Sequence, residues 1–214
     1  LLRWDVEEDE PIPEKALEAI YDQAIANLSD TDCVILSDYG QGVIYDSGVE
    51  RIAKHAKKNA IPIIADPKLT GLHRTHDVDW IIFQSRGFEL MKRRIGESDD
   101  SLAAKSLIKS YGWKHLVVLA GGNGVTIYSQ FDETVHAPCT LPQLRQVIGL
   151  IDAAVVAIAV SISNGFGVSD TALLTNAACE CILSAEATDS FSLSKSMLIH
   201  RVGEIAWNLQ VSKR

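Results

Sequence analysis

Three aspartates stand at the edges of apolar segments, where a carboxylate is well placed to act in chemistry. Asp38 ends the apolar run CVILSD, and Asp66 ends the run IPIIAD. Asp152 stands in VIGLID, at the start of a long segment of small and apolar residues. Such a carboxylate can take a proton from a substrate hydroxyl. It can also simply accept hydrogen bonds from turn amides or complement the start of a helix. The residues alone leave both interpretations open.

The elements that position these aspartates follow from the pattern of apolar residues. Short apolar runs predict strands at 33–38, 61–66, 79–84, 115–120, 124–129 and 133–138. Helical patterns occur at 12–28, 46–58, 86–95, 99–111, 150–163, 168–184 and 194–208. Alternating strands and helices are typical of a mostly parallel sheet covered on both faces. Ligands of such sheets bind outside the carboxyl ends of the strands, where Asp38 and Asp66 stand.

Two local patterns give more detailed expectations. In the first helix, Ile12, Ala16, Ile20 and Ala24 recur at helical spacing and form one apolar side. Between the fourth and fifth strands, the sequence GGNG predicts a tight hairpin, with Asn-Gly supplying the positive φ angles of a primed turn. The hairpin lacks the Lys and Ser/Thr of a P-loop, so a plain turn is favoured over a phosphate cradle.

Composition and charge exclude several classes of protein. The 214 residues are 47% hydrophobic and 22% charged, with a net charge of −8, which argues against a nucleic-acid-binding surface. The apolar stretch 147–162 is short for a membrane span and contains an acid, so a buried helix is expected and no membrane partner. Four cysteines without a CxxC pair predict reduced thiols in a cytoplasmic protein. Because the first residue is Leu1, we expect the sequence to begin inside a longer chain.

The motifs SDYGQG, ADPK and GLID, with LLTNAA further on, resemble the ribokinase-like, or phosphofructokinase-B, carbohydrate kinases. The likeness is greatest to the kinase half of bacterial ADP-heptose synthase, a heptose 7-phosphate kinase. The resemblance implies a three-layer α/β sandwich with a mostly parallel central sheet. Residues 1–214 would form a single domain that lacks the N-terminal substrate-binding portion of the family.

The resemblance also implies a function and its residues. The implied reaction is ATP-dependent phosphoryl transfer to a sugar phosphate, such as D-glycero-D-manno-heptose 7-phosphate, with Mg²⁺ and with a homodimer as the implied assembly. Asp152 would be the catalytic base. Gly149, Gly124 and Asn176 would bind nucleotide or phosphate, and Asp38 and Lys68 would bind substrate. No metal-ligating residue is predicted. From the residues alone, Asn176 could equally cap a local backbone group, and Lys68 could equally be a surface lysine.

Several positions depart from the family's motifs. Where the family has G-A-G-D, this chain has Leu150 and Ile151 between the retained glycine and aspartate. Gln84 and Gly87 stand at the N-x-x-E positions, and 119–124 lacks the charged and hydroxylic contacts of T-R-S-E-x-G. Such losses predict weak or absent turnover, because phosphoryl transfer depends on positioning and charge stabilisation. The alternative to a sugar kinase is therefore an inactive pseudokinase that acts as a binding, sensor or structural partner.

Overall fold

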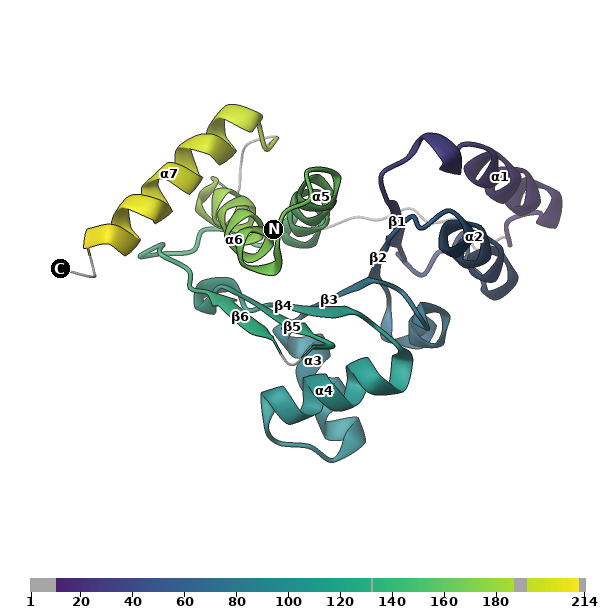
Figure 1. Cartoon of the computed structure of the whole chain (residues 1–214), viewed down its shortest axis with the longest axis horizontal. Coiled ribbons are helices and arrows are strands. Elements are labelled where there is room, and N and C mark those ends of the chain that lie inside the picture. The colour runs from purple at the N-terminus through teal and green to yellow at the C-terminus, as the bar shows by residue number, and fades with distance from the viewer. Residues whose placement is uncertain (1–10, 132, 187–191, 212–214) are drawn as a thin grey trace.

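The sheet is the frame on which the chain is built. The computed structural model describes residues 11–131, 133–186 and 192–211, with no side chains beyond 206. Within these residues one sheet has its strands in chain order (Figure 1). The strands are β1 (Val34–Ser37), β2 (Ile63–Asp66), β3 (Trp80–Gln84), β4 (His115–Leu119), β5 (Val125–Ser129) and β6 (Thr134–Ala137). β1 to β4 are parallel, whereas β5 and β6 are antiparallel to their neighbours.

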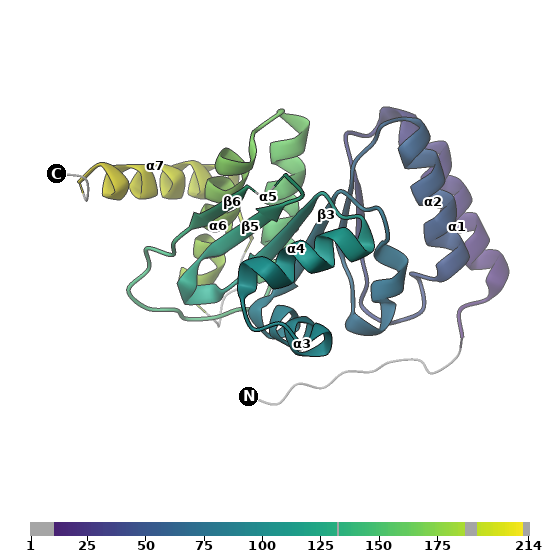
Figure 2. The ribbon, with the colours of Figure 1, turned by 60° about the horizontal axis from the view of Figure 1, so that its bottom comes forward.

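Helices cover both faces of this sheet. Right-handed crossovers between successive parallel strands bring the connecting segments to one face. These segments are α2 (Asp46–Lys58), the 3₁₀ helix η2 (Leu69–Thr75), α3 (Ser85–Ile95) and α4 (Asp100–Tyr111). The other face carries α5 (Leu150–Ser163) and α6 (Val168–Ser184), as Figure 1 shows. The outermost helices are α1 (Glu14–Ala26), which packs on α2, and α7 (Lys195–Val211), which packs on α6. Figure 2 shows α1 and α2 at one end of the molecule and α7 at the opposite end.

Successive residues of the central strands enter different cores. Ile81 and Leu116 belong to the core under α2, α3 and α4, whereas Ile82 and Val117 belong to the core under α5 and α6. All four are at most 1% exposed. Strands buried on both faces need apolar residues at every position, which explains why the runs in the sequence are continuous rather than alternating.

The sequence predicted this architecture well. The observed strands match the predicted ones within two residues at either end, and α2, α5 and α6 have the predicted bounds. The predicted fold class, a three-layer sandwich on a mostly parallel sheet, is confirmed. As a result, Asp38 directly follows β1 and Asp66 ends β2, the neighbouring parallel strand. Asp152 lies in the first turn of α5.

The helix predicted at this place is confirmed as α1, but the apolar side formed by the small and aliphatic residues is not its buried side. Ile20 is 47% exposed and Ala16 also lies at the surface, whereas the neighbouring Tyr21 is buried. The Tyr21 hydroxyl donates to the carbonyl of Val43 at 3.1 Å, and a Cβ at Gly48 would lie 2.5 Å from the Tyr21 ring. A large ring with a partner for its hydroxyl thus fills the space against α2. The apolar spacing of the smaller residues does not decide which side is buried.

The predicted hairpin between β4 and β5 is confirmed, but the Asn-Gly turn predicted for it was wrong. The β4–β5 connection is a 3₁₀ turn over Gly121–Asn123, closed by a hydrogen bond from the Ala120 amide to the Gly124 carbonyl at 2.8 Å. Positive φ angles occur at Gly121 (55°) and Gly124 (88°), not at Asn123. A Cβ at Gly124 would clash with the carbonyl oxygen of Ala137. Glycine is needed there both for its φ angle and for the close approach of β6.

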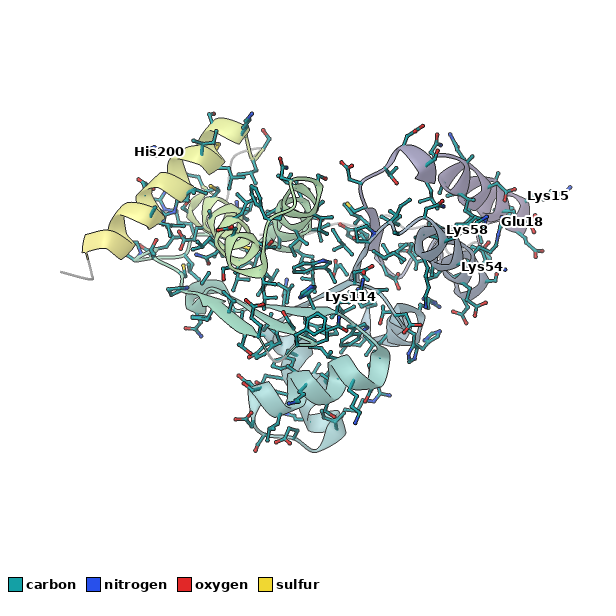
Figure 3. All side chains as sticks on the ribbon, in the orientation of Figure 1. Lys15, Glu18, Lys54, Lys58, Lys114 and His200 are labelled. Atoms are coloured by element: carbon teal, nitrogen blue, oxygen red, sulfur yellow. The ribbon has the colours of Figure 1, made fainter. Side chains whose placement is uncertain are left out.

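The surface and the cysteines complete this description. The exposed charges labelled in Figure 3 on α1 and α2 (Lys15, Glu18, Lys54 and Lys58) are of both signs and lie on the outer side of these helices. The four cysteines are free thiols, and Cys179 and Cys181 are buried. In the part of the chain that the structure describes, no helix has the length and apolarity needed to cross a membrane.

Candidate active-site cleft

A cleft of about 680 Å³ lies at the carboxyl ends of β1, β2 and β3. The first turn of α5, from the sheet face that carries α5 and α6, also lines the cleft. Four of the residues predicted for the site line it together, namely Asp38, Lys68, Gly149 and Asp152. Its volume is in the range of pockets that hold small ligands. The parallel topology thus gathers side chains that lie more than 100 positions apart in the sequence.

Asp152 stands at the open N-terminus of α5. Gly149 is the N-cap residue, with φ 81°, and no side chain caps the helix. The Leu150 amide donates to the carbonyl of Val147 at 3.3 Å, so the amides of Ile151 and Asp152 are the ones left for water or a ligand. The carboxylate of Asp152 accepts a hydrogen bond from the Tyr39 hydroxyl at 3.0 Å, and this bond raises the pKa of Tyr39. An exposed acid with free amides beside it can both accept a proton and leave room for an anion.

Asp38 has a different environment, because its oxygens already have partners. Its side chain is largely buried, and one oxygen accepts the Gly40 amide at 2.8 Å. The other oxygen lies 3.4 Å from an Arg74 guanidinium nitrogen, and Arg74 is itself held by Asp46 at 2.6 Å. Asp38 therefore satisfies a turn amide, as one of the two interpretations of the sequence has it, while its side chain still borders the cleft.

Asp66 is the least satisfied of the three carboxyl groups. Its side chain accepts no hydrogen bond from the residues that the structure describes. Burial raises its pKa to about 6, against the opposing effect of Lys68, and the nearby Asp152 and Asp38 raise it further. This carboxyl is therefore about half protonated near pH 6, where an ordinary aspartate is ionised. The sequence singled out Asp66 as a strand-terminal acid but gave no sign of this raised pKa.

Two cationic side chains border the same cleft, Lys68 after β2 and Arg86 in the first turn of α3. Both are exposed. Lys68 was predicted to bind substrate. Arg86 was missed by the sequence analysis, although it stands two residues after the carboxyl end of β3, where a ligand contact is expected.

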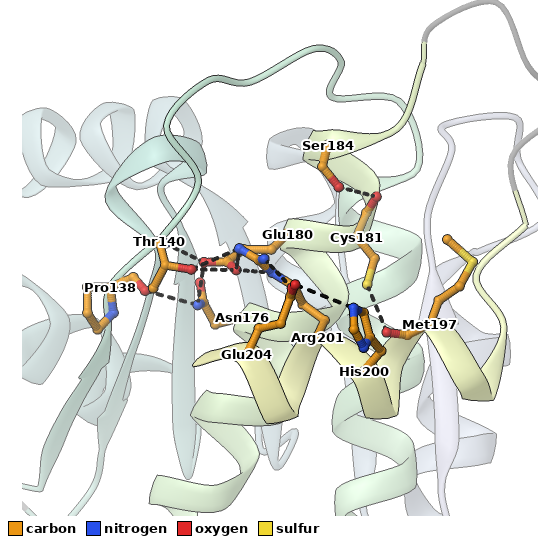
Figure 4. A network of polar contacts seen from close by, with 10 residues as sticks. All are labelled: Pro138, Thr140, Asn176, Glu180, Cys181, Ser184, Met197, His200, Arg201 and Glu204. Carbon is orange, nitrogen blue, oxygen red and sulfur yellow. Dashed lines mark hydrogen bonds and ion pairs between the residues drawn. The ribbon is translucent and has the colours of Figure 1, made fainter. Parts of the chain in front are cut away.

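Gly124 and Asn176, the other two predicted nucleotide contacts, do not line the cleft. Gly124 lies in the β4–β5 hairpin against β6. The buried amide of Asn176 donates to the carbonyl of Pro138 at 3.1 Å and to Glu180 at 3.1 Å (Figure 4). The first contact is with a backbone carbonyl, as in the alternative to a nucleotide role, but this carbonyl is 38 residues away in the chain and not local. A nucleotide role for either residue stays a prediction.

The contacts of Asn176 belong to a buried polar network that the sequence analysis missed (Figure 4). Glu180 in α6 is 0% exposed and accepts the backbone amide of Thr140 at 2.5 Å and the Thr140 hydroxyl at 3.1 Å. Arg201 in α7 donates to the same carboxylate at 2.6 Å and to the Thr140 hydroxyl at 2.8 Å. These hydrogen bonds connect α6, α7 and the segment after β6.

The donor set of the cleft does not fit a magnesium ion held by the protein. In the described ranges, no three His, Cys, Asp or Glu side chains are arranged to hold a metal. Both oxygens of Asp38 are engaged, by Gly40 and Arg74, and one oxygen of Asp152 accepts from Tyr39, which leaves only Asp66 and the second oxygen of Asp152 without a partner among the described residues. Magnesium sites need several oxygen ligands in nearly octahedral geometry, often supplied partly by substrate phosphates. The described residues of the cleft do not supply such a ligand set by themselves.

Comparison with known proteins gives sequence relatives. No family model matches the chain. It is 26% identical over 195 residues to the bifunctional protein HldE of Shewanella piezotolerans and 28% identical over 195 residues to that of Photobacterium profundum. Each match covers 90% of this chain and 40% of the relative. The chain thus spans about two fifths of the length of these curated relatives.

Solved structures share the fold. Phosphofructokinase-2 from Escherichia coli in complex with potassium matches with a TM-score of 0.77 at 13% identity, over 92% of this chain and 64% of that chain. Ribokinase of Arabidopsis thaliana, complexed with ribose and ATP, matches with a TM-score of 0.69 at 18% identity, over 90% and 60%. The chain is thus similar in sequence to HldE proteins over most of its length, and it shares its fold with phosphofructokinase-2 and ribokinase.

Proposed function

We propose that the cleft transfers the γ-phosphoryl group of ATP to a hydroxyl of a sugar phosphate. The observation that carries this proposal is the position of Asp152, in the open first turn of α5 and at the carboxyl ends of three parallel strands. A carboxylate there can accept the hydroxyl proton, and the free amides of the same turn can hold developing negative charge.

The proposed step balances as an in-line displacement. The sugar oxygen forms a bond to the γ-phosphorus, the bond from that phosphorus to the β–γ bridging oxygen breaks, and ADP leaves. The proton of the sugar hydroxyl goes to Asp152. The Tyr39 hydroxyl, 3.0 Å from Asp152, must then share that carboxylate with the substrate. Gly149 keeps the α5 turn free of a side chain where the phosphoryl group would approach.

The substrate proposed is D-glycero-D-manno-heptose 7-phosphate, as the resemblance to heptose 7-phosphate kinases suggests. The sequence identity of 26% to an HldE protein, over 90% of this chain, supports this choice. Lys68 and Asp38 border the cleft where the sugar phosphate would bind. That further sugar-binding residues lie outside 1–214 stays a prediction, as do the homodimer and the cytoplasmic location.

A second candidate function is ligand binding without turnover. Leu150 and Ile151, the residues between Gly149 and Asp152, line the cleft in the first turn of α5. Two aliphatic side chains beside the free amides weaken a site that must hold a highly charged transition state. A protein of this kind would sense or present a sugar phosphate or a nucleotide.

The test is a coupled assay of ADP release by the full-length protein with ATP, Mg²⁺ and the heptose phosphate. We expect sugar-dependent turnover that falls about 10²- to 10⁴-fold in Asp152→Asn, the range for loss of a general base. Asp170→Asn is the matched control, because Asp170 is also an exposed acid in the first turn of a helix but lies outside the cleft.

Three results separate the candidates. Turnover that Asp152→Asn abolishes supports the kinase. Ligand binding by a folded protein without turnover supports the second candidate. Neither binding nor turnover by a folded, full-length protein would reject both.

A further inference from the structure

Arg86 is the arginine in the lining of the cleft. Arg74, Arg145 and Arg201 are each paired with a carboxylate. Arg86 forms no ion pair or hydrogen bond with any residue in the described part of the chain, yet it lines the cleft. An unpaired guanidinium at a concave, polar site is free to take an anion from solution.

The surroundings of Arg86 add positive potential to the same place. Arg86 is the second residue of α3, an eleven-residue helix whose N-cap Gln84 makes no side-chain hydrogen bond. Gln84 and Gly87 also line the cleft, so the uncapped start of α3 opens into it. Lys68 borders it as well. The lining of the cleft therefore carries two cationic side chains and one helix N-terminus, as well as the carboxylates of Asp66 and Asp152.

Among the described residues, the carboxylates of this cleft form no group that could hold a metal, and its positive charge comes from Lys68 and Arg86. We propose that Arg86, together with Lys68, binds a phosphate group directly, without a divalent metal held by the protein. The guanidinium fork matches two phosphate oxygens, and Lys68 adds a point charge. This inference rests on the proposed function, and it names the side chains that hold the phosphate. That phosphate belongs either to the nucleotide or to the sugar phosphate.

Calorimetric titration of the full-length protein tests the proposal. The probes are adenylyl imidodiphosphate with EDTA, the same analogue with Mg²⁺, and heptose 7-phosphate beside the unphosphorylated heptose. The variants are Arg86→Ala, Arg86→Lys and, as a matched control, Arg93→Ala. Arg93 is an exposed arginine of the same helix that lies outside the cleft. Unfolding in urea should be the same for Arg86→Ala and Arg93→Ala, because both side chains are exposed.

We expect wild-type protein to bind at least one phosphorylated probe in EDTA. Arg86→Ala should weaken that binding about 10- to 100-fold, the effect of losing a charge-assisted hydrogen-bonded pair. Arg86→Lys should restore part of it, because it keeps the charge and loses the fork. Arg93→Ala should leave it unchanged. A loss confined to the nucleotide analogue assigns the site to the nucleotide, and a loss confined to heptose 7-phosphate assigns it to the sugar.

Two results would overturn the inference. Binding that requires Mg²⁺, or that Arg86→Ala weakens no more than Arg93→Ala does, rejects direct phosphate binding by Arg86 and leaves the proposed kinase standing. Failure of the folded wild-type protein to bind any probe, with or without Mg²⁺, rejects the proposed function as well.

Discussion

The cleft and the buried network of Figure 4 use the same kinds of side chain in opposite ways. In the network, Glu180 is 0% exposed and accepts hydrogen bonds from Thr140, Asn176 and Arg201. In the cleft, the Asp66 side chain accepts none from the described residues, and Arg86 donates none to them. Buried polar groups with full sets of partners hold elements together. Polar groups left without partners at a concave surface are available to a ligand.

The difference makes the two regions separable by experiment. Substitutions in the network should change the free energy of unfolding, and those in the cleft should change binding or turnover while costing little stability. At one cleft position a substitution should even stabilise the fold, because the charged form of the wild-type residue, Asp66, is partly desolvated.

The largest effect is expected for Glu180→Ala. Removing this carboxylate leaves the Thr140 amide without its acceptor and takes from Arg201 its buried carboxylate partner, so that Arg201 keeps only the Thr140 hydroxyl and the more exposed Glu204. Loss of one member of a buried ion pair costs about 3–5 kcal/mol. Urea unfolding followed by circular dichroism should show this loss in the free energy of unfolding.

Glu204→Ala is the control for that variant. Glu204 contacts the same arginine at 2.7 Å, but its side chain is 44% exposed. Exposed ion pairs contribute about 0–1 kcal/mol. Equal losses for the two variants would show that burial does not distinguish the network, and the contrast with the cleft would fail.

The next effect concerns Asp66 and has the opposite sign. Its pKa is about 6 in the folded protein against an ordinary 3.8, so the folded state favours the protonated form. The associated stability is fully present below pH 3.8 and is lost as the pH rises through 6. Asp66→Asn removes this loss. We expect the variant to be more stable than wild type by about 1–3 kcal/mol at pH 8, since a tenfold change in proton affinity corresponds to about 1.4 kcal/mol.

The pH dependence of the free energy of unfolding distinguishes this effect of ionisation from a structural role of Asp66. Unfolding measured from pH 4 to pH 8 should show a gap between wild type and Asp66→Asn that opens between pH 4 and 6 and then stays constant. A gap independent of pH, or a variant less stable than wild type at pH 8, would mean that Asp66 is a structural partner like Glu180.

What the sequence could predict depended on whether the signal was local. The strands and the bounds of α5 and α6 follow from continuous apolar runs, and Asp152 follows from its place at the start of one of them. The buried side of α1 could not be predicted this way. It is set by the packing of the Tyr21 ring against Gly48, which lies on another helix, α2.

The site residues show the same limit. Asp38 and Lys68 lie at the ends of strands, so topology alone brings them to the cleft. The partner of Glu180 is Arg201, 21 residues away on a different helix, and no spacing rule joins them. Asn176 matches a motif of the family, yet its amide is bonded within this network. A motif gives the type of a residue, whereas its hydrogen-bond partners depend on the packing of distant elements.

The smallest effect on stability is expected for Tyr39→Phe, paired with Tyr21→Phe. Both hydroxyls donate one hydrogen bond, Tyr39 to Asp152 at 3.0 Å and Tyr21 to the carbonyl of Val43 at 3.1 Å. Tyr39 is 64% exposed and Tyr21 is 2% exposed. Water replaces the lost partner in the first case, so we expect a change below about 0.5 kcal/mol, against about 1 kcal/mol in the second. Equal losses in urea unfolding would mean that the bond between Tyr39 and Asp152 is part of the fold. A smaller loss for Tyr39→Phe would leave that carboxylate, like Asp66 and Arg86, available to a ligand.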